Sequence, residues 1–311
     1  VRALAHVPKR QLWLVEVLRS RGLRPGIVSR GYRGANDPAR SVPPGGDAAQ
    51  FGDEPVLLAE RSGVVNLGVE GMMALAALTA FAAAQAYGPL PGVLAAFGVG
   101  ALSGLFLGLF AVTLRANQFV AGLAVAALGL GASGLLGKRY EGLPLAHPLP
   151  EGGFALLGAA LALLVHLFLT RTRTGLFLRS AGENPKAVDL FGVSVDGVRY
   201  LALGLGGGLI GLAGAYLSLA YRPSWTDGMT AGLGWVAIAL VILAAWHPLR
   251  ALLGAYFFGL LFFLQFRLQG SVPIPSEAFA AVPYLLVILV LALSGRSRAP
   301  KALGQPFERG R

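Results

Sequence analysis

Residues 71–114 read GMMALAALTAFAAAQAYGPLPGVLAAFGVGALSGLFLGLFAVTL and contain no Asp, Glu, Lys or Arg. A run of about 20 apolar residues can cross a lipid bilayer as an α-helix, so this stretch predicts two membrane helices separated by a turn at Gly88–Pro91. Helices of soluble proteins keep a polar outer face, which this stretch lacks. Gly100, Gly104 and Gly108 recur at a spacing that lets membrane helices approach closely.

Further uncharged stretches make up most of the remaining chain. They cover residues 116–137, 152–170, 200–221, 228–249, 251–266 and 278–295. The whole chain is 55% hydrophobic and only 13% charged, whereas a soluble domain is about 25% charged. We therefore expect an all-α, polytopic membrane bundle. Its eight expected helices lie near 69–87, 92–114, 117–137, 153–169, 200–221, 232–246, 249–268 and 278–294.

The basic residues predict the orientation in the membrane, because cytoplasmic loops are enriched in Lys and Arg. They are concentrated in the loop before residue 200 and in the tail after residue 295. Four expected helices separate these two places, so both lie on the cytoplasmic side. The loops 138–152, 222–231 and 269–277 then face outward. The net charge of +11 fits basic loops, and we expect no nucleic-acid partner.

Residues 1–60 have the character of a soluble α/β protein. Residues 12–21 (LWLVEVLRSR) have helical periodicity, Gly22–Gly26 interrupts it, and residues 36–46 are rich in Gly, Pro, Asp and Asn. Such a stretch has too little apolar sequence for a core of its own. We therefore expect two parts, a soluble fragment over residues 1–60 and a membrane domain over residues 61–311.

The loop RTRTGLFLRSAGENPKAVDLFGVSVDGVRY, residues 171–200, contains a predicted short helix. Asn184 suits an N-cap, Pro185 suits the first helical turn, and Gly192 ends the helix. Ala187, Val188 and Phe191 give it an apolar face. The spacing fits either docking onto a partner protein or an ordinary loop helix at the membrane surface.

Few polar residues occur near the expected membrane helices. Asn66 and Glu70 stand at the start of one helix, and Asn117 and Gln118 at the start of another. Each pair either caps its helix or lines a translocation path. The chain has no cysteine, which excludes disulfides and thiolate metal sites. We expect no catalytic residues, no metal site and no cofactor.

Several ordered motifs resemble the permeases of ABC importers for branched-chain amino acids, simple sugars and nucleosides. They are RSGVVNLGVEGMM (61–73), LRANQFVAGLA (114–124), TGLFLRSAGENPKAVDLFGVSV (174–195), RYLALGLGGGLIGLAGAYLSL (199–219) and ALGQPFERG (302–310). The resemblance covers residues from about 60 to 311 and is greatest for the sugar and nucleoside subgroup. It implies a multi-pass protein of the inner (plasma) membrane with a cytoplasmic C-terminus.

The same resemblance implies partners. They are an ATP-binding cassette ATPase, a second related permease and an extracytoplasmic substrate-binding protein. It also implies that the loop with Gly182, Glu183, Asn184 and Pro185 forms the coupling helix seated on the ATPase. A secondary transporter working alone is the alternative, but no proton-relay charges lie in the middle of the expected helices.

A second resemblance concerns the N-terminal part. RGLRPGIVSRGYRG (21–34) and GDEPVLLAER (52–61) resemble tetraacyldisaccharide 4'-kinase, the lipid A kinase, over residues 12–61. That family has a glycine-rich phosphate loop before this point, whereas here the sequence is His6-Val7-Pro8-Lys9-Arg10. The resemblance therefore implies a kinase fragment without activity.

The two resemblances meet at LLAERSG, residues 57–63. We therefore expect a chimera whose permease part lacks its first membrane helix or helices. Residues 43–55, which stand in that place, carry Asp47, Asp53 and Glu54 and are unsuited to cross a bilayer. A genuine fusion with a tolerated cytoplasmic extension is the alternative.

Overall fold

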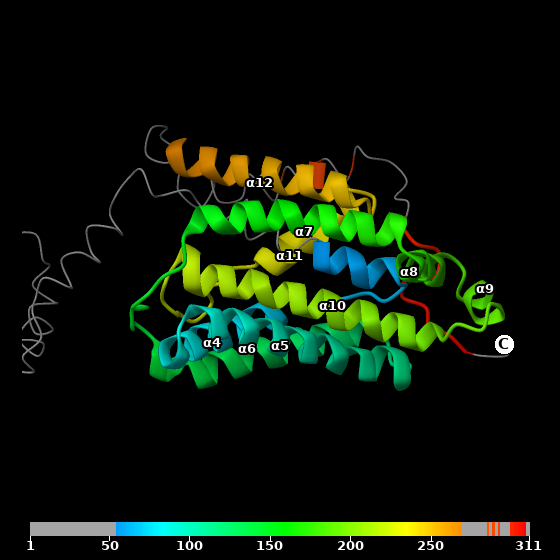
Figure 1. The fold of residues 1–311 in the computed structure, drawn as a ribbon, viewed down its shortest axis with the longest axis horizontal. Coiled ribbons are helices and arrows are strands. Elements are labelled where there is room, and N and C mark those ends of the chain that lie inside the picture. The colour runs from blue at the N-terminus through cyan, green and yellow to red at the C-terminus, as the bar shows by residue number, and fades with distance from the viewer. Residues whose placement is uncertain (1–53, 269–284, 286–287, 290–291, 293–298, 309–311) are drawn as a thin grey trace, which may run out of the picture. The chain divides into compact units, whose positions relative to one another are not determined.

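The computed structural model describes residues 54–268, 285, 288–289, 292 and 299–308. The chain divides into two compact units, residues 1–42 and 43–311, and every described residue belongs to the second. Apart from two isolated β-bridges, the regular structure of the described residues is helical, as predicted. The helices in Figure 1 are α4 (Val69–Tyr87), α5 (Pro89–Gly108), α6 (Gln118–Gly137), α7 (Glu151–Arg171), α8 (Arg173–Glu183), α9 (Pro185–Leu190), α10 (Val195–Tyr216), α11 (Leu233–Leu243) and α12 (Pro248–Leu268).

Four described helices are long and apolar enough to cross a membrane. They cover Val69–Tyr87, Pro89–Thr113, Gln118–Tyr140 and Val195–Tyr221, and three of them continue beyond α5, α6 or α10 through a short π- or 3-10-helical turn. A fifth span results if α7 and α8, which are bent by 79° at Thr172, are counted together. α11 and the apolar part Pro248–Leu261 of α12 are shorter. Most of the expected helix 278–294 lies outside the described residues, so the number of eight stays a prediction.

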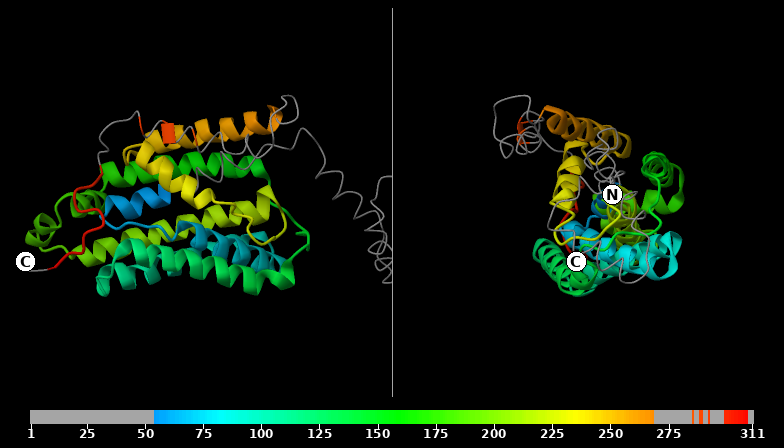
Figure 2. Two further views of the ribbon diagram at one scale, coloured as in Figure 1. Left: turned by 180° about the vertical axis from the view of Figure 1, so that it is seen from behind. Right: turned by 90° about the vertical axis from the view of Figure 1, so that its left-hand side faces the viewer.

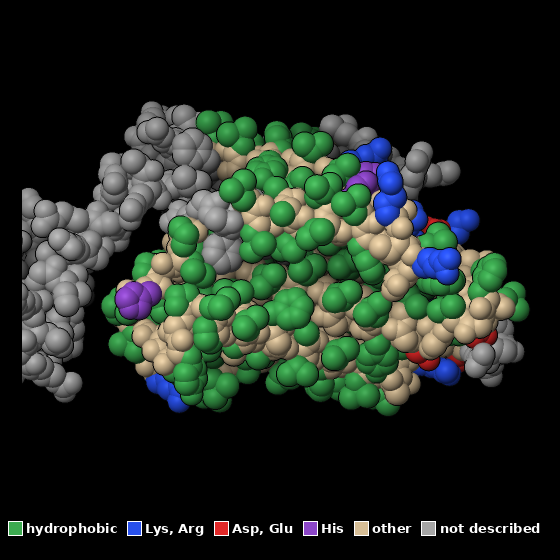
Figure 3. Space-filling view, in the orientation of Figure 1, with side chains coloured by type: hydrophobic (Ala, Val, Ile, Leu, Met, Phe, Trp, Pro, Cys, Tyr) green, Lys and Arg blue, Asp and Glu red, His purple; other side chains and the backbone are tan. Residues whose placement is uncertain are grey.

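The described surface has the distribution expected of a membrane protein. In Figure 3, hydrophobic side chains cover the middle of the helices, and charged side chains gather at the two ends. Leu94, Leu102 and Leu135 are 64%, 66% and 70% exposed. Such large apolar side chains are stable at these positions when lipid covers them.

Glycines allow α5 and α10 to pack backbone against backbone. A Cβ on Gly100 would meet the carbonyl oxygen of Gly207, and a Cβ on Gly104 would meet that of Leu203. Gly211 approaches Ala96 in the same way. The glycine spacing read from the sequence therefore marks a real helix contact, because close packing drives the association of membrane helices.

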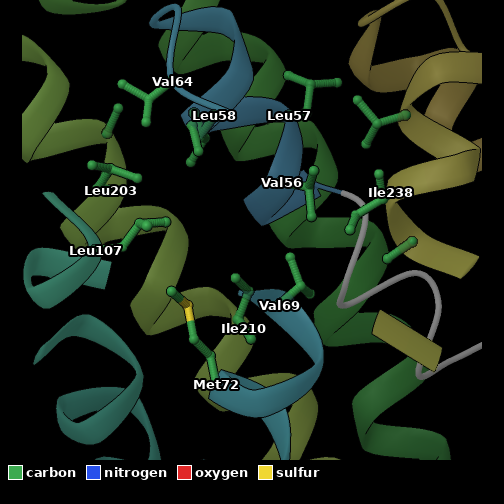
Figure 4. Packing of buried hydrophobic residues seen from close by; sticks show 14 of the residues in the cluster. Val56, Leu57, Leu58, Val64, Val69, Met72, Leu107, Leu203, Ile210 and Ile238 are labelled. Carbon is green, nitrogen blue, oxygen red and sulfur yellow. The ribbon is translucent and has the colours of Figure 1, made fainter. Parts of the chain in front are cut away.

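The helix that precedes α4 is separated from it by a non-helical segment. Residues 54–61 are helical, residues 62–68 form a break, and α4 begins at Val69. Figure 4 shows Val56, Leu57 and Leu58 packed among Leu107, Leu203 and Ile210 of other helices. The bundle therefore begins no later than Glu54, ahead of the boundary expected after residue 60.

Two parts of the chain meet at the end of the bundle where α8 and α9 lie, which we call the α9 end. Figure 2 shows residues 299–308, in red, beside α8 and α9 at this end. The opposite end carries loop 141–149, where Leu145 N–H donates to the Pro223 carbonyl over 2.8 Å and Leu149 N–H to the Leu219 carbonyl over 2.9 Å. The loop 222–232 runs from there to the start of α11.

Candidate coupling site and helix break

The loop between α7 and α10 forms the short helix that the sequence predicts. Asn184 caps α9, its side-chain oxygen accepting from Ala187 N–H over 3.2 Å, and Pro185 occupies the first turn. Gly192 follows the helix with a φ of +77°, a left-handed conformation that suits glycine. The position of α9 therefore follows from local sequence.

The apolar side chains of this helix do not share one face. Val188 is 1% exposed and belongs to the main hydrophobic cluster of the bundle, while Phe191 is 80% exposed. Ala187 is half-buried between them, and Leu190, which the sequence analysis did not select, is 89% exposed. The exposed apolar surface at α9 thus consists of Leu190 and Phe191, with Val188 anchoring the helix to the bundle.

Gly182 brings the end of α8 into direct contact with the helix break. A Cβ on Gly182 would meet the Arg61 carbonyl oxygen, and it would lie 3.2 Å from the Gly63 nitrogen. Arg199 of α10 is 1% exposed, and its Nε donates to the Ser62 carbonyl over 3.4 Å. The end of α8 is therefore in direct contact with residues 61–63.

The C-terminal segment, residues 299–308, joins the same junction. Ala302 N–H donates to the Gly182 carbonyl over 2.8 Å, and Gly304 N–H donates to the Gly63 carbonyl over 3.1 Å. The loop, the break and the C-terminal segment are thus connected by backbone hydrogen bonds.

Glu60 stands at the end of the first helical segment and holds the far end of α11. It is 3% exposed, and its carboxylate accepts from the Trp246 indole Nε1–H over 2.6 Å. The neighbouring Arg61 donates from Nε to the Trp246 carbonyl over 2.7 Å. Trp246 follows α11, so this contact ties the C-terminal end of α11 to the helix break.

Glu70 holds the other end of α11. Its Oε1 accepts from Thr230 Oγ1–H over 2.6 Å and from Gly232 N–H over 2.9 Å, and its Oε2 accepts from Gly234 N–H over 2.7 Å. Glu70 is 4% exposed and lies in the first turn of α4. The N-termini of α4 and α11 therefore converge at one carboxyl group.

The four polar residues selected from the sequence occupy different environments. Asn66, Glu70 and Gln118 are 0%, 4% and 1% exposed. Gln118 Oε1 accepts from Val65 N–H over 2.8 Å, and Asn66 Oδ1 accepts from Gly68 N–H over 3.0 Å, so both satisfy backbone groups of the break. Asn117 is exposed and caps α6, accepting from Phe119 N–H and Val120 N–H. The structure therefore brings Asn66 and Gln118 together at the break, with Glu70 at the start of α4, and leaves Asn117 outside.

Comparison with known proteins identifies this arrangement. The family described as the branched-chain amino acid transport system permease component matches residues 55–291, which is most of the chain. The chain belongs to that permease family. It is an ABC transporter permease, and the resemblance inferred from its motifs is confirmed.

Curated relatives of the permease are similar along most of their length. A protein named for glucose ABC transport in Haloferax volcanii is 37% identical over 305 residues, covering 81% of this chain and 92% of the relative. The guanosine ABC transporter permease protein of Bacillus subtilis is 32% identical over 292 residues, covering 82% of this chain and 91% of the relative. The nucleoside ABC transporter permease protein of Lactococcus lactis is 32% identical over 282 residues, covering 80% of this chain and 89% of the relative. No solved structure matches the permease.

The kinase resemblance is also found, over a short region. The tetraacyldisaccharide-1-P 4'-kinase family matches residues 10–87. The tetraacyldisaccharide 4'-kinase of Dechloromonas aromatica is 57% identical over 53 residues, which is 17% of this chain and 16% of the relative. The two family matches overlap over residues 55–87. The stretch PVLLAER, which resembles the kinase, thus lies within the helical bundle of the permease.

Sequence reasoning missed the buried partners at the α9 end. Glu60 and Arg61 were considered only as parts of the motifs that meet at LLAERSG, Arg199 belonged to the basic loop, and Trp246 was not assigned a partner. A charged pair directly before Ser62-Gly63, in an otherwise apolar region, was the available signal. Its partner is 186 residues away in the chain, so no local pattern identifies it.

Proposed function

We propose that the permease carries nucleosides or simple sugars across the inner membrane, driven by a separate ATP-binding cassette ATPase. A second, related permease and an extracytoplasmic substrate-binding protein complete the assembly. Similarity to permeases named for guanosine, nucleoside and glucose transport, each over about nine-tenths of the relative, carries this proposal. The permease itself contributes no catalytic site.

The coupling loop runs from Gly182 to Phe191 in this proposal. Glu183 and Asn184 are exposed, and Leu190 and Phe191 present apolar side chains beside them. When ATP closes two ATPases together, the loop moves with them. Because Gly182 touches Arg61, that movement reaches the helix break, and through Glu60 it reaches the C-terminal end of α11.

The translocation path lies beside the helix break in this proposal, with Asn66, Gln118 and Glu70 setting its shape. Convergent helix N-termini attract an anion in many transporters. Here the carboxylate of Glu70 occupies that place. An uncharged solute, such as a nucleoside or a hexose, is therefore the substrate class that the site favours over an anionic one.

ATPase docking is tested by copurification with the ATP-binding cassette ATPase of the proposed importer. Phe191→Asp and Glu183→Lys should abolish copurification and leave membrane insertion unchanged. Leu143→Asp is the matched control, since Leu143 is 45% exposed at the opposite end. Val188→Asp is unsuitable because Val188 is buried in the bundle. Unchanged copurification of both loop variants would refute the docking role.

Substrate class is tested by uptake into proteoliposomes that hold the assembled importer. Guanosine, glucose and leucine are supplied in turn as radiolabelled solutes. We expect ATP-dependent uptake of the nucleoside or the sugar. Uptake of leucine alone would overturn the substrate proposal while leaving the permease assignment in place. In the same assay Gln118→Ala should reduce uptake, and Asn117→Ala should not.

The α9 end faces the cytoplasm in this proposal. The chain contains no cysteine, so Phe191→Cys and Leu143→Cys can be labelled separately with a membrane-impermeant maleimide. We expect Leu143→Cys to react from outside intact cells and Phe191→Cys to react only after lysis. The opposite pattern would invert the topology.

The N-terminal part is an inactive kinase fragment fused to the permease, we propose, with the join inside residues 55–87. The purified chain should transfer no phosphate from ATP to a tetraacyldisaccharide 1-phosphate acceptor, because the phosphate loop is missing. Amplifying codons 50–70 from source DNA tests whether the two parts are joined in one gene. Comparing uptake by this chain with uptake by a version whose first 60 residues are replaced by a hydrophobic hairpin tests how much transport the N-terminal fragment costs. A contiguous locus with full uptake by the chain as written would defeat the chimera interpretation.

A further inference from the structure

A cavity of about 440 Å³ lies between the coupling loop and the C-terminal segment. One wall consists of residues 183–186, at the junction of α8 and α9, and the other of residues 301–302 and 305–308. We call it the loop–tail cavity. Its volume is within the range of about 300–1,000 Å³ that is usual for binding pockets, so it is large enough for side chains of another protein.

The C-terminal segment is fixed in place on the permease. Besides the backbone bonds from Ala302 and Gly304, Arg115 and Glu308 form an ion pair of 3.7 Å. Phe307 packs against the main hydrophobic cluster and also lines a second cavity of about 190 Å³. The wall that this segment contributes is therefore a defined surface.

The chemistry of the loop–tail cavity suits a protein segment. Pro185, Ala302, Pro306 and Phe307 give it apolar surface. Lys186 and Lys301 contribute one basic group from each wall, and Glu183 and Glu308 one acidic group from each, of which Glu308 is paired with Arg115. An apolar side chain beside an acidic one complements this lining. The cavity is continuous with the coupling loop, since Glu183 and Asn184 belong to both.

We propose that the C-terminal segment is the second half of the ATPase docking site, so that the ATPase inserts a segment between the coupling loop and residues 301–308. This inference rests on the proposed function, because the occupant is the same ATPase. It adds a contact element that lies more than 100 residues beyond the loop in sequence and identifies Lys301 and Lys186 as residues that recognise an acidic partner group.

The test measures binding of the purified ATPase to the full-length permease in nanodiscs by biolayer interferometry. Lys186→Glu combined with Lys301→Glu should weaken binding by about tenfold or more. Lys138→Glu, a lysine exposed at the opposite end, is the charge-matched control and should bind like the native chain. Melting temperatures of all variants show whether folding is preserved.

A cross-linking measurement keeps the result independent of folding effects. Gln305→Cys lies in the cavity wall and is exposed, so a bifunctional reagent should join it to the ATPase; Leu143→Cys should not be joined. If Phe191→Asp weakens binding while the lysine double variant binds normally and Gln305→Cys gives no cross-link, the inference fails and the proposed function stands. If the native chain does not bind the ATPase, both fail.

Discussion

The two ends of α11 are held by two glutamates that lie ten residues apart in sequence, but they are held differently. At the N-terminal end, Glu70 accepts three hydrogen bonds, two of them from backbone N–H groups. At the C-terminal end, Glu60 accepts one from an indole side chain, beside the coupling loop. The backbone-anchored end is the more rigid of the two. We therefore infer that α11 pivots at Glu70 when the α9 end moves.

The largest expected effect comes from adding a side chain at the N-terminal end of α11, where it contacts Glu70. We call this end of α11 the Glu70 end. A Cβ on Gly234 would lie 2.6 Å from the Glu70 nitrogen and 2.7 Å from its Cα, and backbone atoms give way poorly. Gly234→Ala should destabilise the purified permease by about 3 kcal/mol, although alanine is the better helix former by about 0.5–1 kcal/mol. Gly254→Ala, whose Cβ would meet only a Leu240 side chain at 3.4 Å, should be close to neutral. Thermal unfolding in detergent measures both, and equal losses would contradict a rigid Glu70 end.

A smaller effect distinguishes the two carboxylates directly. In Glu70→Gln the amide nitrogen cannot accept, so at least one buried donor loses its partner, at a cost of about 1–3 kcal/mol. In Glu60→Gln the amide oxygen still accepts from Trp246, so the cost should stay below about 1 kcal/mol. The difference between the two melting temperatures is the measurement. A larger loss for Glu60→Gln would reverse the assignment of the rigid end.

Loosening α9 should leave the Glu70 end unchanged. Asn184→Ala removes the cap of α9, which costs about 1 kcal/mol locally. We expect faster hydrogen exchange at residues 185–190 and unchanged exchange at residues 232–234. Asn117→Ala, which removes the cap of α6, is the matched control and should spare residues 185–190. Faster exchange at both ends of α11 in Asn184→Ala would show that they are not independent.

The smallest expected effect is a pH dependence of the melting temperature that arises at the C-terminal end of α11, beside Trp246. Burial lowers the pKa of His247 below its ordinary value of 6.5, and the nearby charges of Arg250, His166 and Arg61 lower it further. The neutral form therefore contributes stability above pH 6.5, and that stability is lost as the pH falls through the lowered pKa. His247→Gln should flatten the fall in melting temperature below pH 6.5. His147→Gln, at the exposed opposite end, should leave it unchanged.

Local sequence rules predicted the parts of the site that are local. The cap at Asn184, the first turn at Pro185 and the glycine stop at Gly192 each depend on neighbours within a few residues. They failed for Val188, because in a six-residue helix the face that is buried depends on which part of the bundle lies beneath it. The polar positions Asn66, Glu70 and Gln118 were selected from the sequence and are buried in the structure, but their partners were not identified.

Local sequence rules could not identify those partners, for a physical reason. Glu70 begins its own helix, yet its bonds go to Thr230, 160 residues away, and to the start of α11. Residues 230–234 (TAGLG) carry no charge that would mark them as partners. Their donors are backbone groups, which every sequence contains, so only the fold selects them.

The backbone-to-backbone contact of α5 with α10 has a consequence for inheritance. Every missense change in a glycine codon adds a side chain, since all other amino acids carry a Cβ. At Gly100, Gly104, Gly207 and Gly211 that Cβ meets backbone of the other helix. No neighbouring codon offers a gradual alternative, so natural variants should be nearly absent at these four sites, while the lipid-facing leucines of α5 drift freely among apolar residues. A saturation library scored by uptake would then display the contact as a stripe of intolerance along each helix.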